Sequence, residues 1–207
     1  MMKKIIKYII GLFVAAIVIY NSLYFRPLDE KLSESKEIAF DAKSFVEGIW
    51  ENDLMNAYDS AVDLMILMGK LRENPDVTFE REAQALGIGN IGYFKVRAEG
   101  TVLSVTENNV LMKAGDQIVE LETEFIFGNA VRDASGLIKS NAYDKTADFN
   151  SISESINDKI RKEIIPDFRA KVVKGNKVIF KGAIELNKAH LDLRQPEVIP
   201  VSIQIIQ

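Results

Sequence analysis

The spacing of hydrophobic residues changes several times along this chain, and each change predicts a different element. The first apolar run carries no charged residue between Lys7 and Arg26. Taken from Ile5 to Tyr24 as a helix, it would be about 30 Å long, which matches the hydrocarbon core of a bilayer. Lysines precede this run and mixed charges follow it, which predicts a cytoplasmic start and an extracytoplasmic body. Residues 1–27 are therefore predicted to form a single-pass anchor in the plasma (inner) membrane.

Two other interpretations of this apolar run compete with an anchor: a cleaved signal peptide and a lipoprotein leader. A cleaved signal peptide needs small residues at its cleavage site, whereas residues 20–24 read YNSLY. Cleavage is therefore the less favoured alternative. A lipoprotein carries its lipid on a cysteine after the apolar run, and this sequence contains no cysteine. The same absence excludes disulfides, thiolate zinc sites and thiol catalysis within this sequence.

Residues 28–90 have the three- and four-residue apolar spacing that is typical of helices, and we expect a helical subdomain there. Asp41 is expected to cap one helix and Asp53 a second helix with a broad apolar stripe. Pro75 interrupts that stripe, and a short third helix is expected to open at Thr78.

From residue 91 the apolar spacing becomes two, which is typical of strands with one buried face. In the first predicted strand the alternation slips after Gly100, which indicates a bend or bulge. Two further strands are expected at 110–114 and 118–127, joined by a tight turn. In the last of these strands, Phe125 and Phe127 are expected to point to the buried side.

A one-faced helix and two more strands complete the pattern. The helix is expected to start with Ser151 as its cap. Its isoleucines recur every four residues: Ile152, Ile156, Ile160 and Ile164. Three meandering strands, a helix and two strands (177–186 and 198–206) follow the order of an OB barrel, in which the helix closes one mouth. We therefore predict an α+β fold with a five-stranded OB-like β-barrel domain at 91–207; an open sheet crossed by a helix is the alternative.

Charge and composition exclude several function classes. The 26 basic and 30 acidic residues are spread along the chain and give a net charge of −4. No polybasic tract is present, so nucleic acid is not an expected partner. His190 is the single histidine, whereas imidazole metal sites need converging donors, and the chain has no G-x-S-x-G motif. No catalytic residue, metal site or cofactor is predicted, and the protein is not expected to be an enzyme.

The densest group of polar side chains follows the third predicted strand. Gly128 allows the chain to turn sharply, and Asn129, Arg132 and Asp133 then offer an amide, a guanidinium and a carboxylate. These three residues are the predicted binding residues. The alternative is that Arg132 and Asp133 pin the loop to the barrel rim through local hydrogen bonds.

Other carboxylates suggest a rival class of function. Asp133, Asp144 and Asp148 fall within one polar segment, and such oxygen ligands suit hard cations. Their spacing is wider than that of calcium loops, which favours a solvated loop with local turns. An extracytoplasmic carboxylate-based hydrolase or ion-binding protein is nevertheless kept as the alternative function.

Four segments carry a resemblance to a known family: NSLYF at 21–25, FDAK at 40–43, FGNAVRDAS at 127–135 and DFN at 148–150. With them the chain resembles an uncharacterised bacterial family described as predicted periplasmic lipoproteins of unknown function. Its members are often encoded beside ribose- or xylose-type sugar ABC transporters. The resemblance implies a membrane-anchored accessory or binding protein whose partners are transporter or solute-binding subunits, or a saccharide. It attaches no role to the motif, so it implies no catalytic residue.

Overall fold

The computed structural model describes residues 40–85 and 89–206, with a few isolated positions before residue 21. The predicted anchor at 1–27 thus lies largely outside the described residues. Within the part that is described, no helix has the length and apolar character needed to cross a membrane. The chain divides into two units, and the fold below is that of the second, Asp41–Gln207, which holds both the helical segment and the barrel.

The second unit begins with three helical stretches that follow one another without a break: α3 (Ala42–Ile49), the π-helical η1 (Trp50–Leu54) and α4 (Met55–Asp59). Asp41 caps α3, since its carboxylate accepts hydrogen bonds from the backbone N–H groups of Lys43 and Ser44. This prediction is confirmed. Asp53 was expected to cap a new helix, but it lies inside η1, because the π turn joins α3 directly to α4.

A two-residue strand and two helices come next: β1 (Val62–Asp63), α5 (Leu64–Glu73) and α6 (Pro75–Glu82). Asp63 caps α5. Asn74 caps α6, and its side chain accepts a hydrogen bond from the N–H of Val77. With a proline in the first turn, α6 therefore starts earlier than the expected position at Thr78.

Five strands close into a barrel: β2 (Ile91–Val105), β3 (Asn109–Ala114), β4 (Gln117–Glu122), β5 (Lys177–Asn187) and β6 (Glu197–Ile206). Their order is β2-β3-β4-β6-β5, and β5 pairs with β2 to close the ring, while β1 adds to the outer edge of β2. β4 and β6 are parallel, and the other barrel pairs are antiparallel. The predicted five-stranded barrel is confirmed, and the open sheet is excluded.

The bend in β2 lies where the sequence predicts it. The register between β2 and β3 shifts between Val102 and Ser104. At Gly100 an added Cβ would lie 2.4 Å from the carbonyl oxygen of Lys113 on β3. Only glycine lets the two backbones approach this closely.

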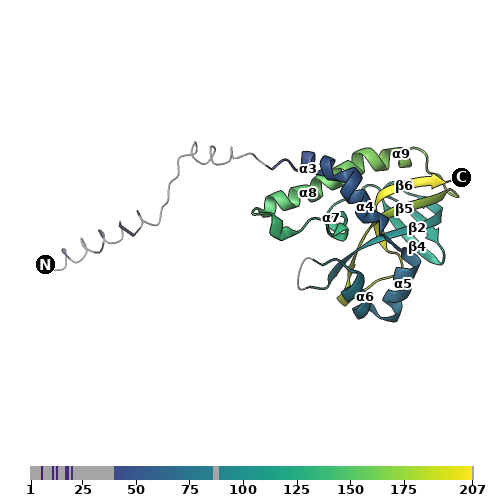
Figure 1. Cartoon of the computed structure of the whole chain (residues 1–207), viewed down its shortest axis with the longest axis horizontal. Coiled ribbons are helices and arrows are strands. Elements are labelled where there is room, and N and C mark those ends of the chain that lie inside the picture. The colour runs from purple at the N-terminus through teal and green to yellow at the C-terminus, as the bar shows by residue number, and fades with distance from the viewer. Residues whose placement is uncertain are drawn as a thin grey trace. The chain divides into compact units, whose positions relative to one another are not determined.

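Phe168 of α9 (Ile165–Arg169) and Val172 belong to the hydrophobic cluster that holds the inward-facing strand residues of the barrel, together with residues of α5. The isoleucine-bearing helix α8 (Thr146–Lys159) was expected to close one mouth of the barrel, and that expectation is wrong. The isoleucines of α8 are buried but lie outside the barrel cluster. α8 instead packs beside α3 and α7 (Ala130–Ser135), next to the barrel (Figure 1).

Two details of this helix differ from the sequence pattern. It starts at Thr146, so Ser151 lies inside it and donates a hydrogen bond to the carbonyl of Asp148. After α8 a π turn, η3 (Ile160–Ile164), inserts one extra residue into the helical period. The buried face therefore passes to Ile165.

The third barrel strand is shorter than predicted. β4 ends at Glu122, and Phe125 and Phe127 are 58% and 63% exposed, whereas Ile126 is buried. The expectation that both phenylalanines point inward is wrong, because the chain leaves the ladder and its alternation of two ends with it. Both rings instead lie on the outer surface.

Candidate functional site

The predicted binding residues lie on or beside α7, a helix that packs against the outer face of β2 and β5 (Figure 1). All residues of α7 are buried. Gly128 before the helix and Gly136 after it have φ angles of 76° and 70°. This left-handed conformation strongly favours glycine, so the chain can turn into and out of a very short helix.

Arg132 is 1% exposed, and its guanidinium group is used within the protein. Its Nε donates to Oδ1 of Asp133 at 2.7 Å, and its Nη1 donates to the carbonyl oxygen of Phe149 at 2.9 Å. The guanidinium carbon also lies 3.5 Å from the centre of the Phe149 ring. Arg132 therefore links α7 to α8 through charge-assisted hydrogen bonds and a cation–π contact.

Asp133 is 4% exposed, yet its second carboxylate oxygen, Oδ2, has no hydrogen-bond partner among the described residues. Burial raises the pKa of Asp133, and the hydrogen bond from Arg132 opposes this without cancelling it. The residue lines a cavity of about 220 Å³, here called the Asp133 pocket. Its lining is Gln84, Ala85, Asp133, Gly136, Ile138, Lys139 and Ser140. A buried hydrogen-bond acceptor without a partner is uncommon in proteins, and here it makes the Asp133 pocket a candidate ligand site.

The three predicted residues have different positions relative to this pocket. Asp133 lines it, and Arg132 contacts Asp133 through Oδ1. Asn129 is half-buried and is not among the lining residues; its backbone carbonyl accepts the N–H of Asp133 at 2.9 Å. The geometry therefore brings Arg132 and Asp133 together and leaves Asn129 outside the pocket lining.

Two tyrosines that the sequence did not single out surround α7. The hydroxyl of Tyr58 on α4 donates to the carbonyl of Val131 at 2.9 Å, and this side chain is fully buried. Burial, together with the nearby carboxylates of Glu185 and Asp133, raises the pKa of Tyr93 on β2 to about 12. Asp133 also raises the pKa of Glu185 on β5, after the larger effect of burial. Asp133 thus contributes to the raised pKa values of one residue on each of the two strands that α7 packs against.

Asp133, Asp144 and Asp148, the carboxylates of the alternative hydrolase or ion-binding function, do not form one cluster. Asp144 is exposed and Asp148 is half-buried, whereas Asp133 is held by Arg132. Across residues 40–85 and 89–206, no three histidine, aspartate or glutamate side chains are grouped so that they could hold a metal ion. His190 is exposed in the 3-10 turn η4 (Lys188–His190).

A second hollow, which we call the acidic groove, lies on the outer surface of the barrel and has a volume of about 470 Å³. It is lined by Glu122, Phe125, Phe127, Ala130, Ala183, Glu185, Glu197 and Ile199. Its residues come from the end of β4 and the segment that follows it, the start of α7, and strands β5 and β6. Sequence reasoning missed it because its three glutamates are far apart along the chain.

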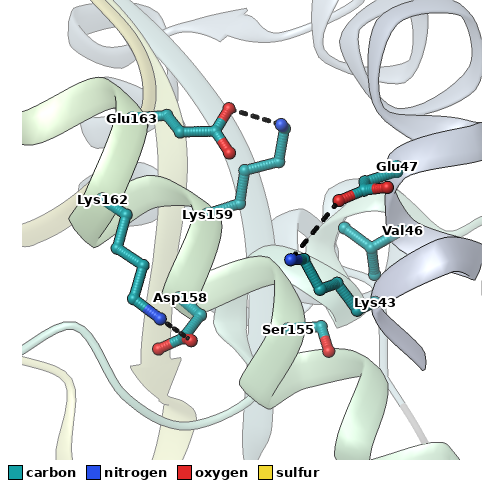
Figure 2. Close-up of a pocket in the computed structure, with 8 residues that line it drawn as sticks. All are labelled: Lys43, Val46, Glu47, Ser155, Asp158, Lys159, Lys162 and Glu163. Atoms are coloured by element: carbon teal, nitrogen blue, oxygen red, sulfur yellow. Dashed lines mark hydrogen bonds and ion pairs between the residues drawn. The ribbon is translucent and has the colours of Figure 1, made fainter. Parts of the chain in front are cut away.

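A third hollow lies between α3 and the segment α8–η3, and Figure 2 shows its side chains. Its charges neutralise one another within the chain. Lys159 pairs with Glu163 at 2.5 Å, and Lys162 pairs with Asp158 at the same distance. Lys43 lies 3.9 Å from a carboxylate oxygen of Glu47. With each lysine beside an acid, this hollow has the character of an ordinary solvated surface.

A five-stranded barrel in the order β2-β3-β4-β6-β5, with helices between its third and fourth strands, has the architecture of an OB fold. Among solved structures the chain is similar to an OB-fold protein from Thermotoga maritima, with a TM-score of 0.72 and 23% sequence identity. The match covers 81% of this chain and 99% of that chain, and it concerns the fold.

Residues 13–204 match the family described as predicted periplasmic lipoprotein (DUF2291), and the chain belongs to this family. The resemblance stated from the sequence is confirmed to that extent, and the family description makes this an extracytoplasmic protein of unknown function. No curated protein matches the chain.

Proposed function

We propose that this protein is a non-enzymatic binding or accessory protein that residues 1–27 tether to the membrane as a single transmembrane helix. The uncharged run between Lys7 and Arg26 supports this anchor, as does the lack of a cysteine that could carry a lipid. The full chain should remain in the membrane fraction after alkaline carbonate extraction, with its body open to protease from the outside. Recovery of uncleaved full chain in the soluble fraction would contradict the tether.

The Asp133 pocket is the proposed ligand site, and the unpartnered Oδ2 of Asp133 is the observation that carries it. Gln84, Lys139 and Ser140 add an amide, an ammonium group and a hydroxyl to the lining. This mixture of donors and acceptors suits a ligand rich in hydroxyl groups, and we propose a small saccharide. A cavity of about 220 Å³ is small compared with the usual range of about 300–1,000 Å³ for drug-sized ligands.

Thermal unfolding of the full chain in a non-ionic detergent, with a panel of pentoses and hexoses, tests this site. A sugar at about a hundred times its Kd adds about 2.7 kcal/mol of stability, which is a clear rise in Tm. Lys139→Ala and Ser140→Ala should reduce that rise, whereas Lys145→Ala, an exposed lysine outside the lining, should not.

Three results would overturn or redirect this assignment. An unchanged Tm with every sugar of the panel would refute saccharide binding. An equal rise in all three variants would move the binding to another site. A rise with calcium or magnesium, in place of sugars, would favour the alternative that uses Asp133, Asp144 and Asp148.

The link to a sugar importer is proposed from the family resemblance alone. A tether near a transporter would raise the local concentration of a binding module without any further contact. Under this proposal, cross-linking in membranes should couple the full chain to transporter or solute-binding subunits, which mass spectrometry identifies. The absence of such subunits among the cross-linked products would contradict the importer context.

A further inference from the structure

The acidic groove opens where the barrel is least closed. β4 and β6 pair through only two residues of β4, Glu120–Leu121. After Glu122 the chain leaves the ladder and passes toward α7, so that it forms one wall of the groove. Ala183 on β5 and Ile199 on β6, which are paired across the two strands, contribute apolar surface from the barrel itself. The groove is thus an open trough with an apolar base.

Three carboxylates stand around this base. Glu185 and Glu197 lie two residues from the Ala183–Ile199 pair along their antiparallel strands, so they share its face. The Oε2 atom of Glu122 is buried and has no hydrogen-bond partner among the described residues. In the part of the chain that the structure describes, Glu122, Glu185 and Glu197 form no ion pair with a lysine or arginine. The groove therefore holds negative charge that the protein itself does not neutralise.

Aromatic surface lies beside these carboxylates. Phe125 and Phe127 are more than half exposed, which is unusual for neighbouring large apolar side chains on a folded surface. The guanidinium carbon of Arg161 lies 5.2 Å from the centre of the Phe127 ring, so this ring already accepts one arginine. Arg161 itself is engaged elsewhere, since it donates to the carbonyl of Ile126 and pairs with Asp158. Arg161 therefore forms no ion pair with Glu122, Glu185 or Glu197.

We propose that the acidic groove binds an extended, arginine-bearing segment of a partner protein. An arginine side chain would stack on Phe125 and be held by the carboxylates of Glu122, Glu185 and Glu197. Arginine fits better than lysine, because its planar guanidinium stacks on rings, is weakly hydrated and binds carboxylates through two parallel hydrogen bonds. This site is separate from the Asp133 pocket, and the proposal does not depend on saccharide binding there.

A peptide explains the groove better than a small cation does. A lone amine or guanidine would neutralise the glutamates but would leave the two exposed rings and the apolar base largely uncovered. A segment that alternates arginine with apolar residues covers both features at once, as buried anchors do at protein interfaces. The volume of about 470 Å³ is about twice that of the Asp133 pocket, which also suits a stretch of side chains.

Fluorescence anisotropy with a labelled hexapeptide of alternating arginine and leucine tests this proposal. The full chain is used in a non-ionic detergent at about 0.15 M salt, where the screening length is about 8 Å. We expect saturable binding of this peptide. The same peptide with citrulline in place of arginine, which keeps the shape and loses the charge, should bind at least about tenfold more weakly, the factor that about 1.4 kcal/mol represents.

Paired variants locate the binding. Glu185→Gln combined with Glu197→Gln should weaken the arginine peptide at least about tenfold, and Phe125→Leu should weaken it about two- to fivefold. Glu99→Gln combined with Glu154→Gln removes the same charge from exposed positions outside the groove and should leave the affinity within about twofold. Circular dichroism and Tm confirm that each variant is folded.

Each contrary result would overturn the proposal. Equal loss in the control pair would mean general charge attraction, and equal binding of the citrulline peptide would mean that the glutamates play no part. Displacement of the arginine peptide by an equal concentration of spermidine would mean that the groove takes a small amine instead of a peptide.

Discussion

Replacing Arg132 with methionine should cost the protein a large share of its stability. The side chain is 1% exposed and connects α7 to α8 through Asp133 and Phe149. Methionine fills similar space but cannot donate a hydrogen bond. The variant therefore leaves the carboxylate of Asp133 buried without its partner, and the carbonyl of Phe149 loses the side-chain donor that Arg132 provides.

The size of the loss follows from these contacts. Breaking a buried ion pair by removing one partner costs about 3–5 kcal/mol. The two hydrogen bonds to the charged group, at about 1.5–3 kcal/mol each, lead to a similar figure. A domain has a total stability of about 5–15 kcal/mol, so the variant should lose at least about a fifth of it. With a urea m-value of about 2 kcal/mol/M, the midpoint should fall by about 1.5–2.5 M.

Urea unfolding of the full chain in detergent, followed by tryptophan fluorescence, measures this loss. Arg97→Met is the matched control, because Arg97 is exposed and the change there should stay within about 0.5 kcal/mol. Adding Asp133→Asn to Arg132→Met removes the orphaned charge and should restore about 1–3 kcal/mol. A loss below about 1 kcal/mol, or no recovery in the double variant, would refute the role assigned to this pair.

Three further predictions concern stability. Burial and neighbouring glutamates raise the pKa of Glu122 above 4.5, so its ionised form costs stability that the protonated form does not. Glu122→Gln should therefore raise Tm at neutral pH, and the gain should vanish below pH 4.5; a gain that grows toward acid pH would contradict this. Gly100→Ala should cost about 1–3 kcal/mol in urea unfolding, because its Cβ would collide with the backbone of Lys113. The control is Gly69→Ala in α5, where a Cβ would meet no other atom, and this change should stabilise the protein by about 0.4–1 kcal/mol. Phe168→Ala should cost about 3–5 kcal/mol in the same assay, and a cost below about 1 kcal/mol would mean that this ring is not an integral part of the hydrophobic core.

Local signals in the sequence predicted the parts of the fold that depend on local interactions. The cap at Asp41 and the bulge after Gly100 involve residues close together in the chain. The position at which β4 ends depends instead on the neighbouring strand. β4 stops at Glu122 because its partner on β3, Asn109, is the first residue of that strand, and no pairing is left beyond it. The alternation that continued to Phe127 carried no information about where the neighbouring strand begins.

The candidate sites show the same division. Arg132 and Asp133 are adjacent in sequence, so their pairing was open to prediction, but the stacking of Arg132 on Phe149 depends on how α7 packs against α8. The convergence of Glu122 and Glu185 depends on the register of the barrel strands. Two π turns, which no apolar spacing revealed, also moved the buried faces of the helices.

The shortness of α7 has a mechanical consequence. Ala130 at its start lines the acidic groove, and Asp133, one turn later, lines the Asp133 pocket. A helix of six residues is only about 9 Å long, and the hydrogen bond from Tyr58 to Val131 ties its middle to α4. A displacement of this short helix at one hollow would therefore change the lining of the other. If the two proposed ligands both bind, linkage requires each to change the affinity of the other by the same factor.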